Sequence, residues 1–155
     1  MQIFDFFKKK PVEFVKFCDS FGNFEITYPK NWHFDKNIAV VDGQYTNSFY
    51  SNDSNFTISV NAKIYEKFNF KKYAKQELES PSSGILTKPK KSKFLGMPSY
   101  NREYSYHSDG KEYFGGGIMF FTGRIVFSLN WNAPKYDKEK KKIFDQMISS
   151  LKVVK

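Results

Sequence analysis

Residues 24–32 read FEITYPKNW, and this stretch fixes how the fold begins. Its apolar residues alternate with polar ones, which is the two-residue period of a strand with one buried face. Pro29 has no backbone N–H to give to a sheet, so the strand ends there. The turn-forming residues 19–23 precede it, and another alternating run, residues 12–17, comes before the turn. The stretch therefore predicts an antiparallel hairpin.

The rest of the chain continues in short strands with two helical segments. Asp109-Gly110 is a strong hairpin signal between two of the strands. Helical spacing of apolar residues predicts helices over 70–78 and 137–154. Strands are expected over 38–41, 44–50, 56–64, 85–94 (a Lys-rich edge strand), 99–107, 111–121 and 124–131. We predict an α+β fold, in which a twisted antiparallel sheet of about six or seven strands has helices packed on its faces.

Composition narrows the class of protein. A chain of 155 residues fits one domain with a core of its own. Its single cysteine, Cys18, excludes an intramolecular disulfide. No apolar run is long enough to span a membrane, and residues 1–10 lack the pattern of a secretory leader. A cytoplasmic protein is expected.

The chain carries a net charge of +9, nearly all of it from lysine. Arg102 and Arg124 are the only arginines, although arginine is the residue that specific phosphate and base recognition favours. Two interpretations of this charge are open. The lysines either only keep the protein well solvated, or they form a basic surface that binds nucleic acid or an anionic membrane.

Residues 1–11 are expected to form an amphipathic arm ahead of a single domain over 12–155. The arm places Ile3, Phe6 and Phe7 on one helical face, and Lys8, Lys9 and Lys10 follow. One interpretation is structural: the arm is a helix packed on the domain, or a partly frayed terminus. The other is functional: the arm is a weak anchor to a membrane surface or a partner, with its lysines turned toward anionic groups.

The motif Tyr28-Pro29-Lys30-Asn31-Trp32 after a strand resembles the opening of the PsbP-like family. A helix in mid-chain, a long antiparallel meander and a closing helix with Phe144, Ile148 and Ser149-Ser150 extend the resemblance to about residues 14–153. The family includes the photosystem protein PsbP and a Ran-binding nuclear-import factor. The resemblance implies an α/β/α sandwich and a non-enzymatic binding or assembly role, and it transfers no catalytic residues. We expect no cofactor and no metal site.

Residue types suited to catalysis are few. Cys18 is expected to be structural, and His33 and His107 lack the context of a catalytic triad. The pairs His33–Asp35 and His107–Asp109 repeat one spacing and would form a metal site only if they converged. One reading has Glu103 and Glu112 facing each other across the Asp109-Gly110 hairpin, but a cross-strand pairing with Arg102 or Lys111 is favoured over acid–base work. An enzyme with an unrecognised site is the least favoured function.

Gly115, Gly116 and Gly117 lie in a predicted strand, so a phosphate loop is not favoured. A bulge or the close approach of another element explains them; the alternative is a flat floor for a ligand or partner, ringed by Tyr104, Tyr106, Tyr113 and Phe114. The candidate partner surface comprises Tyr104, Tyr106, Tyr113, Gly115, Gly116 and Gly117. The leading hypothesis is a module that binds another protein there, and the alternative is the basic surface.

Overall fold

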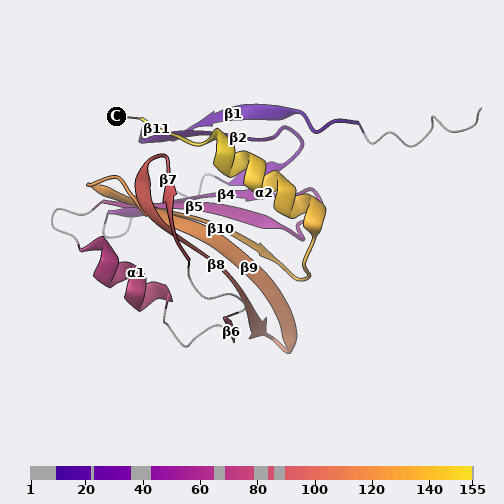
Figure 1. Ribbon diagram of the computed structural model, residues 1–155. Coiled ribbons are helices and arrows are strands. Elements are labelled where there is room, and N and C mark those ends of the chain that lie inside the picture. Colours follow the sequence, from indigo (N-terminus) through magenta and orange to yellow (C-terminus); the bar gives the residue numbers. More distant parts are fainter. Residues whose placement is uncertain are drawn as a thin grey trace, which may run out of the picture.

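A large antiparallel sheet organises the structure, which is a computed structural model that describes residues 10–21, 23–35, 43–64, 69–78, 84–85 and 90–154 (Figure 1). Its strand order is β3-β4-β5-β10-β9-β8-β6, and β7 also pairs with β8. The bounds are β3 His33–Asp35, β4 Gln44–Tyr50, β5 Thr57–Ile64, β6 Gly84–Ile85, β7 Lys90–Phe94, β8 Met97–Ser108, β9 Lys111–Phe121 and β10 Ile125–Ala133. The predicted α+β class and antiparallel sheet are confirmed.

The predicted first hairpin forms, but it belongs to a separate, smaller sheet. β1 (Phe14–Cys18) and β2 (Phe24–Pro29) pair antiparallel, and β11 (Lys152–Val153) pairs with the other edge of β2. The sequence analysis predicts one sheet, because local periodicity marks the strands but does not show which strands pair with one another.

The YPKNW segment closes β2 with a hydrogen-bonded turn. The Trp32 N–H donates to the Pro29 carbonyl at 2.9 Å, and the Lys30 N–H donates to the Glu13 carbonyl at 2.9 Å. Trp32 is thereby buried against Phe56, with ring centroids 6.0 Å apart. The motif therefore joins the smaller sheet to the larger one.

The two helices lie on opposite faces of the larger sheet (Figure 1). Helix α1 (Phe70–Leu78) has the predicted bounds and buries Phe70 and Ala74 against Val126. Helix α2 (Lys138–Ser150) lies on the other face together with the smaller sheet. We call the face that carries α1 the outer face and the face toward α2 the inner face.

Helix α2 is shorter than predicted. Asp137 caps its start, since the carboxylate accepts from the N–H groups of Glu139 and Lys140. Leu151 is extended, and β11 follows instead of the helical turn expected up to residue 154. Pairing with β2 competes successfully with a helical pattern that continues through Leu151, because tertiary contacts override local propensity.

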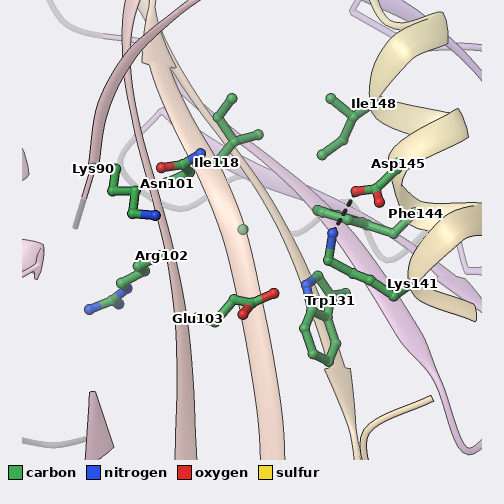
Figure 2. A pocket seen from close by; sticks show the side chains of 11 residues that line it. Lys90, Asn101, Arg102, Glu103, Ile118, Trp131, Lys141, Phe144, Asp145 and Ile148 are labelled. Carbon is green, nitrogen blue, oxygen red and sulfur yellow. Dashed lines mark hydrogen bonds and ion pairs between the residues drawn. The ribbon is translucent and has the colours of Figure 1, made fainter. Parts of the chain in front are cut away.

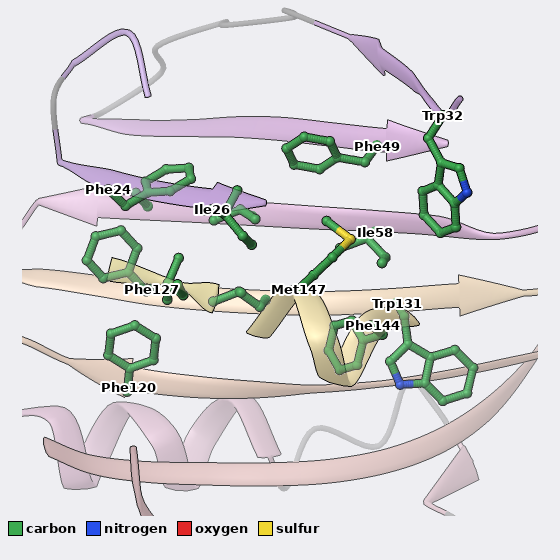
Figure 3. Close-up of a cluster of buried hydrophobic side chains, with 14 of the residues drawn as sticks. Phe24, Ile26, Trp32, Phe49, Ile58, Phe120, Phe127, Trp131, Phe144 and Met147 are labelled. Carbon is green, nitrogen blue, oxygen red and sulfur yellow. The ribbon is translucent and has the colours of Figure 1, made fainter. Parts of the chain in front are cut away.

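The core lies between the larger sheet, the smaller sheet and α2 (Figure 3). The smaller sheet contributes Phe24 and Ile26, the larger sheet Phe127 and Trp131, and α2 Met147, all of them at most 1% exposed. Aromatic rings fill much of this space, which explains how a leucine-poor chain buries enough apolar surface.

The turn between β1 and β2 is tied to β4 by a polar network. The Tyr45 hydroxyl donates to Asp19 Oδ2 at 2.8 Å and accepts from Asn23 Nδ2 at 2.7 Å. The Asn23 N–H also donates to Asp19 Oδ2, at 3.1 Å. These bonds join the two sheets at one end of the core.

The predicted Asp109-Gly110 turn and the lysine-rich strand are also found. Asp109 and Gly110 have φ of 52° and 73° and connect β8 to β9, as the hairpin signal indicates. Lys90, Lys91 and Lys93 are exposed on β7. The strand expected at 38–41, residues 86–89 of the predicted edge strand, and residues 1–9 of the arm, Lys8 and Lys9 included, lie outside the described residues; Lys10 is described and exposed.

Candidate functional site

The pairing of β8 with β9 decides which side chains share a face. Tyr104 is opposite Gly115 and Tyr106 is opposite Tyr113, so these four residues lie on the outer face, and so does Gly117. Gly116 lies on the inner face. Phe114 is on the inner face too, packed against the core, so it does not belong to the aromatic ring that the sequence predicts.

Arg102, Tyr104, Tyr106 and Tyr113 form a continuous row on the outer face, which we call the tyrosine ladder. Tyr106 and Tyr113 stack with ring centroids 5.4 Å apart and planes 15° apart. Tyr104 follows at 6.2 Å from Tyr106, and the Arg102 guanidinium carbon lies 5.2 Å from the Tyr104 ring centre. All four side chains are half-buried. The ladder is thus partly exposed and held in place by ring contacts.

The three glycines make room for side chains of neighbouring strands. A Cβ on Gly115 would lie 2.6 Å from the Tyr104 ring and 2.7 Å from Asn132 Oδ1. A Cβ on Gly117 would collide with the Leu129 carbonyl and the Asn130 side chain. The pairing of β9 with β8 and β10 runs without interruption through this segment, so there is no bulge. The glycines are therefore explained by the close approach of neighbouring side chains and backbone to β9. The alternative, a flat floor open to a ligand or partner, does not fit, because the Tyr104 ring covers Gly115.

Tyr104 also connects the ladder to β10. Its hydroxyl donates to Asn132 Oδ1 at 3.2 Å. Next to it the outer face is hollowed by a cavity of about 260 Å³, whose polar walls include Ser59, Ser128 and Asn130. The sequence analysis missed these polar residues, although they alternate with the buried residues of β5 and β10. That alternation is the signal by which they could have been found.

Burial changes the ionisation of the ladder. It raises the pKa of the Tyr104 hydroxyl, an effect that Arg102 opposes. It raises the pKa of the Tyr106 hydroxyl as well, and Tyr113 adds to the rise. Both phenols therefore stay protonated well above neutral pH, and the Tyr104 O–H keeps its hydrogen bond to Asn132.

The histidines do not come together. His33 lies on β3 and His107 on β8, and four strands separate β3 from β8 in the sheet order, so the two residues are roughly 24 Å apart across it. Both are exposed. The described residues contain no group of three or more His, Cys, Asp or Glu side chains placed to hold a metal ion. The convergence that a metal site needs is absent from this part of the chain.

The other candidates are placed as follows. Cys18 is exposed at the end of β1, with its Sγ 3.8 Å from Glu25 Oε1. Glu112 is opposite His107, and Glu103 is opposite Gly116, so the two glutamates do not face each other. The reading in which they face each other is wrong, because the pairing register places them four residue pairs apart. No described helix is long and apolar enough to cross a membrane.

Comparison with known proteins identifies the fold. No family model matches the sequence, and no curated protein does. A Bacteroides thetaiotaomicron protein superposes with a TM-score of 0.65 at 21% identity, covering 90% of this chain and 48% of that protein. Cyanobacterial PsbP (CyanoP) from Synechocystis has a TM-score of 0.62 at 13% identity, covering 92% of this chain and 94% of its own.

LpqN of Mycobacterium tuberculosis, described as involved in cell envelope biogenesis, has a TM-score of 0.60 at 14% identity over 93% of this chain and 92% of its own. The chain therefore spans about half the length of the Bacteroides protein and nearly all of CyanoP and LpqN. The class that these similarities define is an α+β protein with a PsbP-like fold, as the YPKNW motif and the order of elements predict.

Proposed function

We propose that the protein is a non-enzymatic module that binds another protein through the tyrosine ladder. The observation that carries the proposal is the stacking of half-exposed Tyr106 on Tyr113, continued by Tyr104 and Arg102. Tyrosine and arginine are enriched among the residues that dominate binding energy in protein interfaces. Rings already held by their neighbours lose little conformational freedom when a partner docks.

The surroundings of the ladder fit a partner with acidic groups. The chain carries a net charge of +9, and the exposed Lys91 and Lys93 lie on the outer face of β7, which pairs with the strand that bears most of the ladder. Opposite charge on the partner would speed association and fix its orientation. The hollow beside Tyr104 would receive a polar side chain of the partner.

The test is affinity capture from lysate of the native organism, followed by measured affinity for the captured protein. Bait proteins are wild type, Tyr106→Ala/Tyr113→Ala, and Tyr136→Ala as a matched control, since Tyr136 is 54% exposed and lies outside the ladder. Loss of two central anchors should weaken binding at least ~30-fold. Equal binding by all three baits would reject the ladder as the interface.

A basic surface that binds nucleic acid or anionic membrane is the alternative. It is supported by the exposed lysines of β7 and by exposed Lys71, Lys72 and Lys75 on α1. Part of the positive charge is already neutralised, as in the ion pair of Lys140 with Asp53. Nuclease treatment and a salt series separate the two functions, because binding to phosphates weakens steeply with salt. The cytoplasmic location stays a prediction.

A further inference from the structure

Exposed apolar side chains gather at one end of the protein. Of the six large hydrophobic residues that are exposed in the described part of the chain, four lie at this end: Phe21, Ile64, Leu95 and Val154. The other two, Val12 and Tyr136, lie before β1 and after β10, at the opposite end. We call the end that carries the four residues the Leu95 end.

Strand pairing places Ile64 and Leu95 at the same end of the larger sheet. Ile64 ends β5 and is opposite Ile125, the first residue of β10. The turn before β10 follows Phe121, the last residue of β9. The end of β9 in turn pairs with the start of β8, beside the turn that Leu95 forms between β7 and β8.

The first turn and the C-terminal segment complete the Leu95 end (Figure 1). The Phe21 ring lies 4.6 Å from the ring of Tyr45, near the start of β4 and so beside the end of β5. The Val154 N–H donates to the Asn23 carbonyl of the same turn at 2.9 Å. β4 and β8 are four strand spacings apart, so the apolar tips spread over roughly 20 Å.

Leu95 occupies a backbone position that suits other residues better. Leu95 and Gly96 have φ of 50° and 77°, and Asp109 and Gly110 of the other β8 hairpin have φ of 52° and 73°. Such two-residue turns favour Asn, Asp or Gly at the first position, where φ is positive. Leu95 breaks this rule, and a side chain that is 53% exposed gains little from packing. Local strain without a gain in packing points to a role at the surface.

The strands behind this turn hold Leu95 in position. Phe94 packs on Phe120 with ring centroids 4.9 Å apart, and the hydroxyls of Ser92 and Ser99 share a hydrogen bond of 2.6 Å. Lys90, at the base of the hairpin, lines the inner-face cavity of about 240 Å³ between α2 and the larger sheet, away from the tip (Figure 2). A tip fixed in this way loses little conformational freedom when it docks.

Exposed cations surround the apolar tips, namely Lys71 and Lys72 at the start of α1, Lys93 of β7, Arg124 of the turn between β9 and β10, and Lys152 of β11. Helix α1 begins near this end because Phe70 stacks on Phe121, with ring centroids 5.8 Å apart. Of the acidic residues described nearby, Asp19 is buried and Glu25 pairs with Lys16 at 2.8 Å. Positive charge is therefore in excess around the tips.

This combination of apolar tips and cations suits a lipid bilayer. The tips stand on four separate segments, so a protein partner would need a matching pocket for each. A fluid bilayer admits each tip on its own, and the apolar part of the surface enters the boundary between headgroups and acyl chains. Lysines beside the tips are attracted to anionic headgroups.

We propose that the Leu95 end docks on an anionic lipid bilayer, with Leu95 and Phe21 entering the acyl boundary and the surrounding cations contacting lipid phosphates. The proposal does not rest on binding by the tyrosine ladder. Tyr106 and Tyr113 lie at the other end of β8 and β9, next to the Asp109-Gly110 turn. A protein docked in this way presents the ladder away from the bilayer.

The test is co-sedimentation of the full chain with vesicles of phosphatidylcholine, with or without about 40% phosphatidylglycerol. We expect binding to the anionic vesicles that weakens as salt is raised. Leu95→Asn should weaken it about tenfold through lost apolar burial, and the protein should stay at least as stable because Asn tolerates positive φ. Lys93→Gln should weaken it about fivefold.

Matched variants separate the Leu95 end from general stickiness. Tyr136→Asn removes an equally exposed side chain at the opposite end and should bind like wild type. Tyr106→Ala/Tyr113→Ala should also bind the vesicles normally, so the ladder and the membrane site fail or succeed separately. Duplex DNA is the comparison ligand, and Leu95→Asn should not change any binding to it, because contacts to phosphates depend on charge.

Insertion is measured with Leu95→Trp and vesicles that contain brominated lipid. The new indole should be quenched, whereas that of Tyr136→Trp should not, and the buried Trp32 and Trp131 give a constant background. No binding to the anionic vesicles, or binding that Leu95→Asn leaves unchanged, overturns the proposal. An equal loss of DNA binding by Leu95→Asn overturns it as well.

Discussion

Tyr45 is the residue on which the contact between β4 and the first turn depends. Its buried hydroxyl bridges Asp19 and Asn23. Tyr45→Phe would keep the ring and remove both bonds, leaving the Asp19 carboxylate with less compensation. We expect the free energy of unfolding in urea to fall by about 1–2 kcal/mol. Tyr136→Phe, an exposed tyrosine, is the control and should change little.

The same hydroxyl makes stability depend on alkaline pH. Burial raises the pKa of Tyr45 above its ordinary value of 10.0, and Asp19 adds to the rise. The folded state therefore holds its proton where the unfolded state releases it. The resulting stability is fully present below pH 10 and is lost as pH rises beyond it. The gap between wild type and Tyr45→Phe should narrow above pH 10; a gap that widens would contradict the assigned pKa.

Gly117 has less room for a side chain than the neighbouring Gly115 and Gly116. A Cβ there would meet the Leu129 backbone carbonyl, which cannot move aside like a flexible side chain. We expect Gly117→Ala to lower the free energy of unfolding by about 1–3 kcal/mol through overpacking. Denaturant unfolding measures this directly. Unchanged stability would mean that β9 and β10 separate at little cost.

At the scale of the elements, Asp53 stabilises the turn between β4 and β5 and ties it to α2. It accepts from Ser51 Oγ at 2.6 Å and from the Asn55 N–H at 3.1 Å, and it pairs with Lys140 of α2. The Lys140 bond, followed by the Ser51 bond, lowers the pKa of this carboxyl below its ordinary 3.8. Because the side chain is half-exposed, we expect Asp53→Asn to destabilise the protein by only about 0.5–1 kcal/mol at neutral pH.

The acid dependence of that difference checks the assignment. A lowered pKa contributes stability that is present above pH 3.8 and is lost as pH falls toward the folded-state pKa. Thermal unfolding of wild type and Asp53→Asn should therefore converge below pH 3.8. A constant difference down to pH 2 would assign the effect to lost turn geometry instead.

Elements with an uninterrupted period were predictable from the sequence, and elements made by distant pairing were not. The alternation of β5 and the helical spacing of α1 are local signals, and both agree with the structure. The end of α2 was mispredicted because Leu151 continues the helical spacing while its backbone is extended. In the site, alternation placed Tyr104 and Tyr106 on one face. The contact of Tyr104 with Asn132 depends on strand register, which periodicity does not contain.

At the scale of the whole molecule, stability should fall from the centre of the larger sheet to the short strands at the margins of both sheets. β10 is paired on both edges, by β5 and β9, and its inner residues are fully buried. β3 and β11 are three and two residues long and lie at the sheet margins. Native-state hydrogen exchange should be slowest in β10 and fast in β3 and β11. Equal protection of β11 and β10 would show that the two sheets unfold as one unit.

The position of β11 has a consequence for synthesis on the ribosome. The Thr27 N–H donates to Ser150 Oγ at 2.8 Å, across 123 residues of sequence, and β11 then pairs with β2. Contacts between such distant segments form late, since the chain between them must first be ordered. The first hairpin leaves the ribosome long before its partner is translated. Until then the apolar side of Phe24 and Ile26 lacks its cover, and nascent chains should depend on chaperones over that interval.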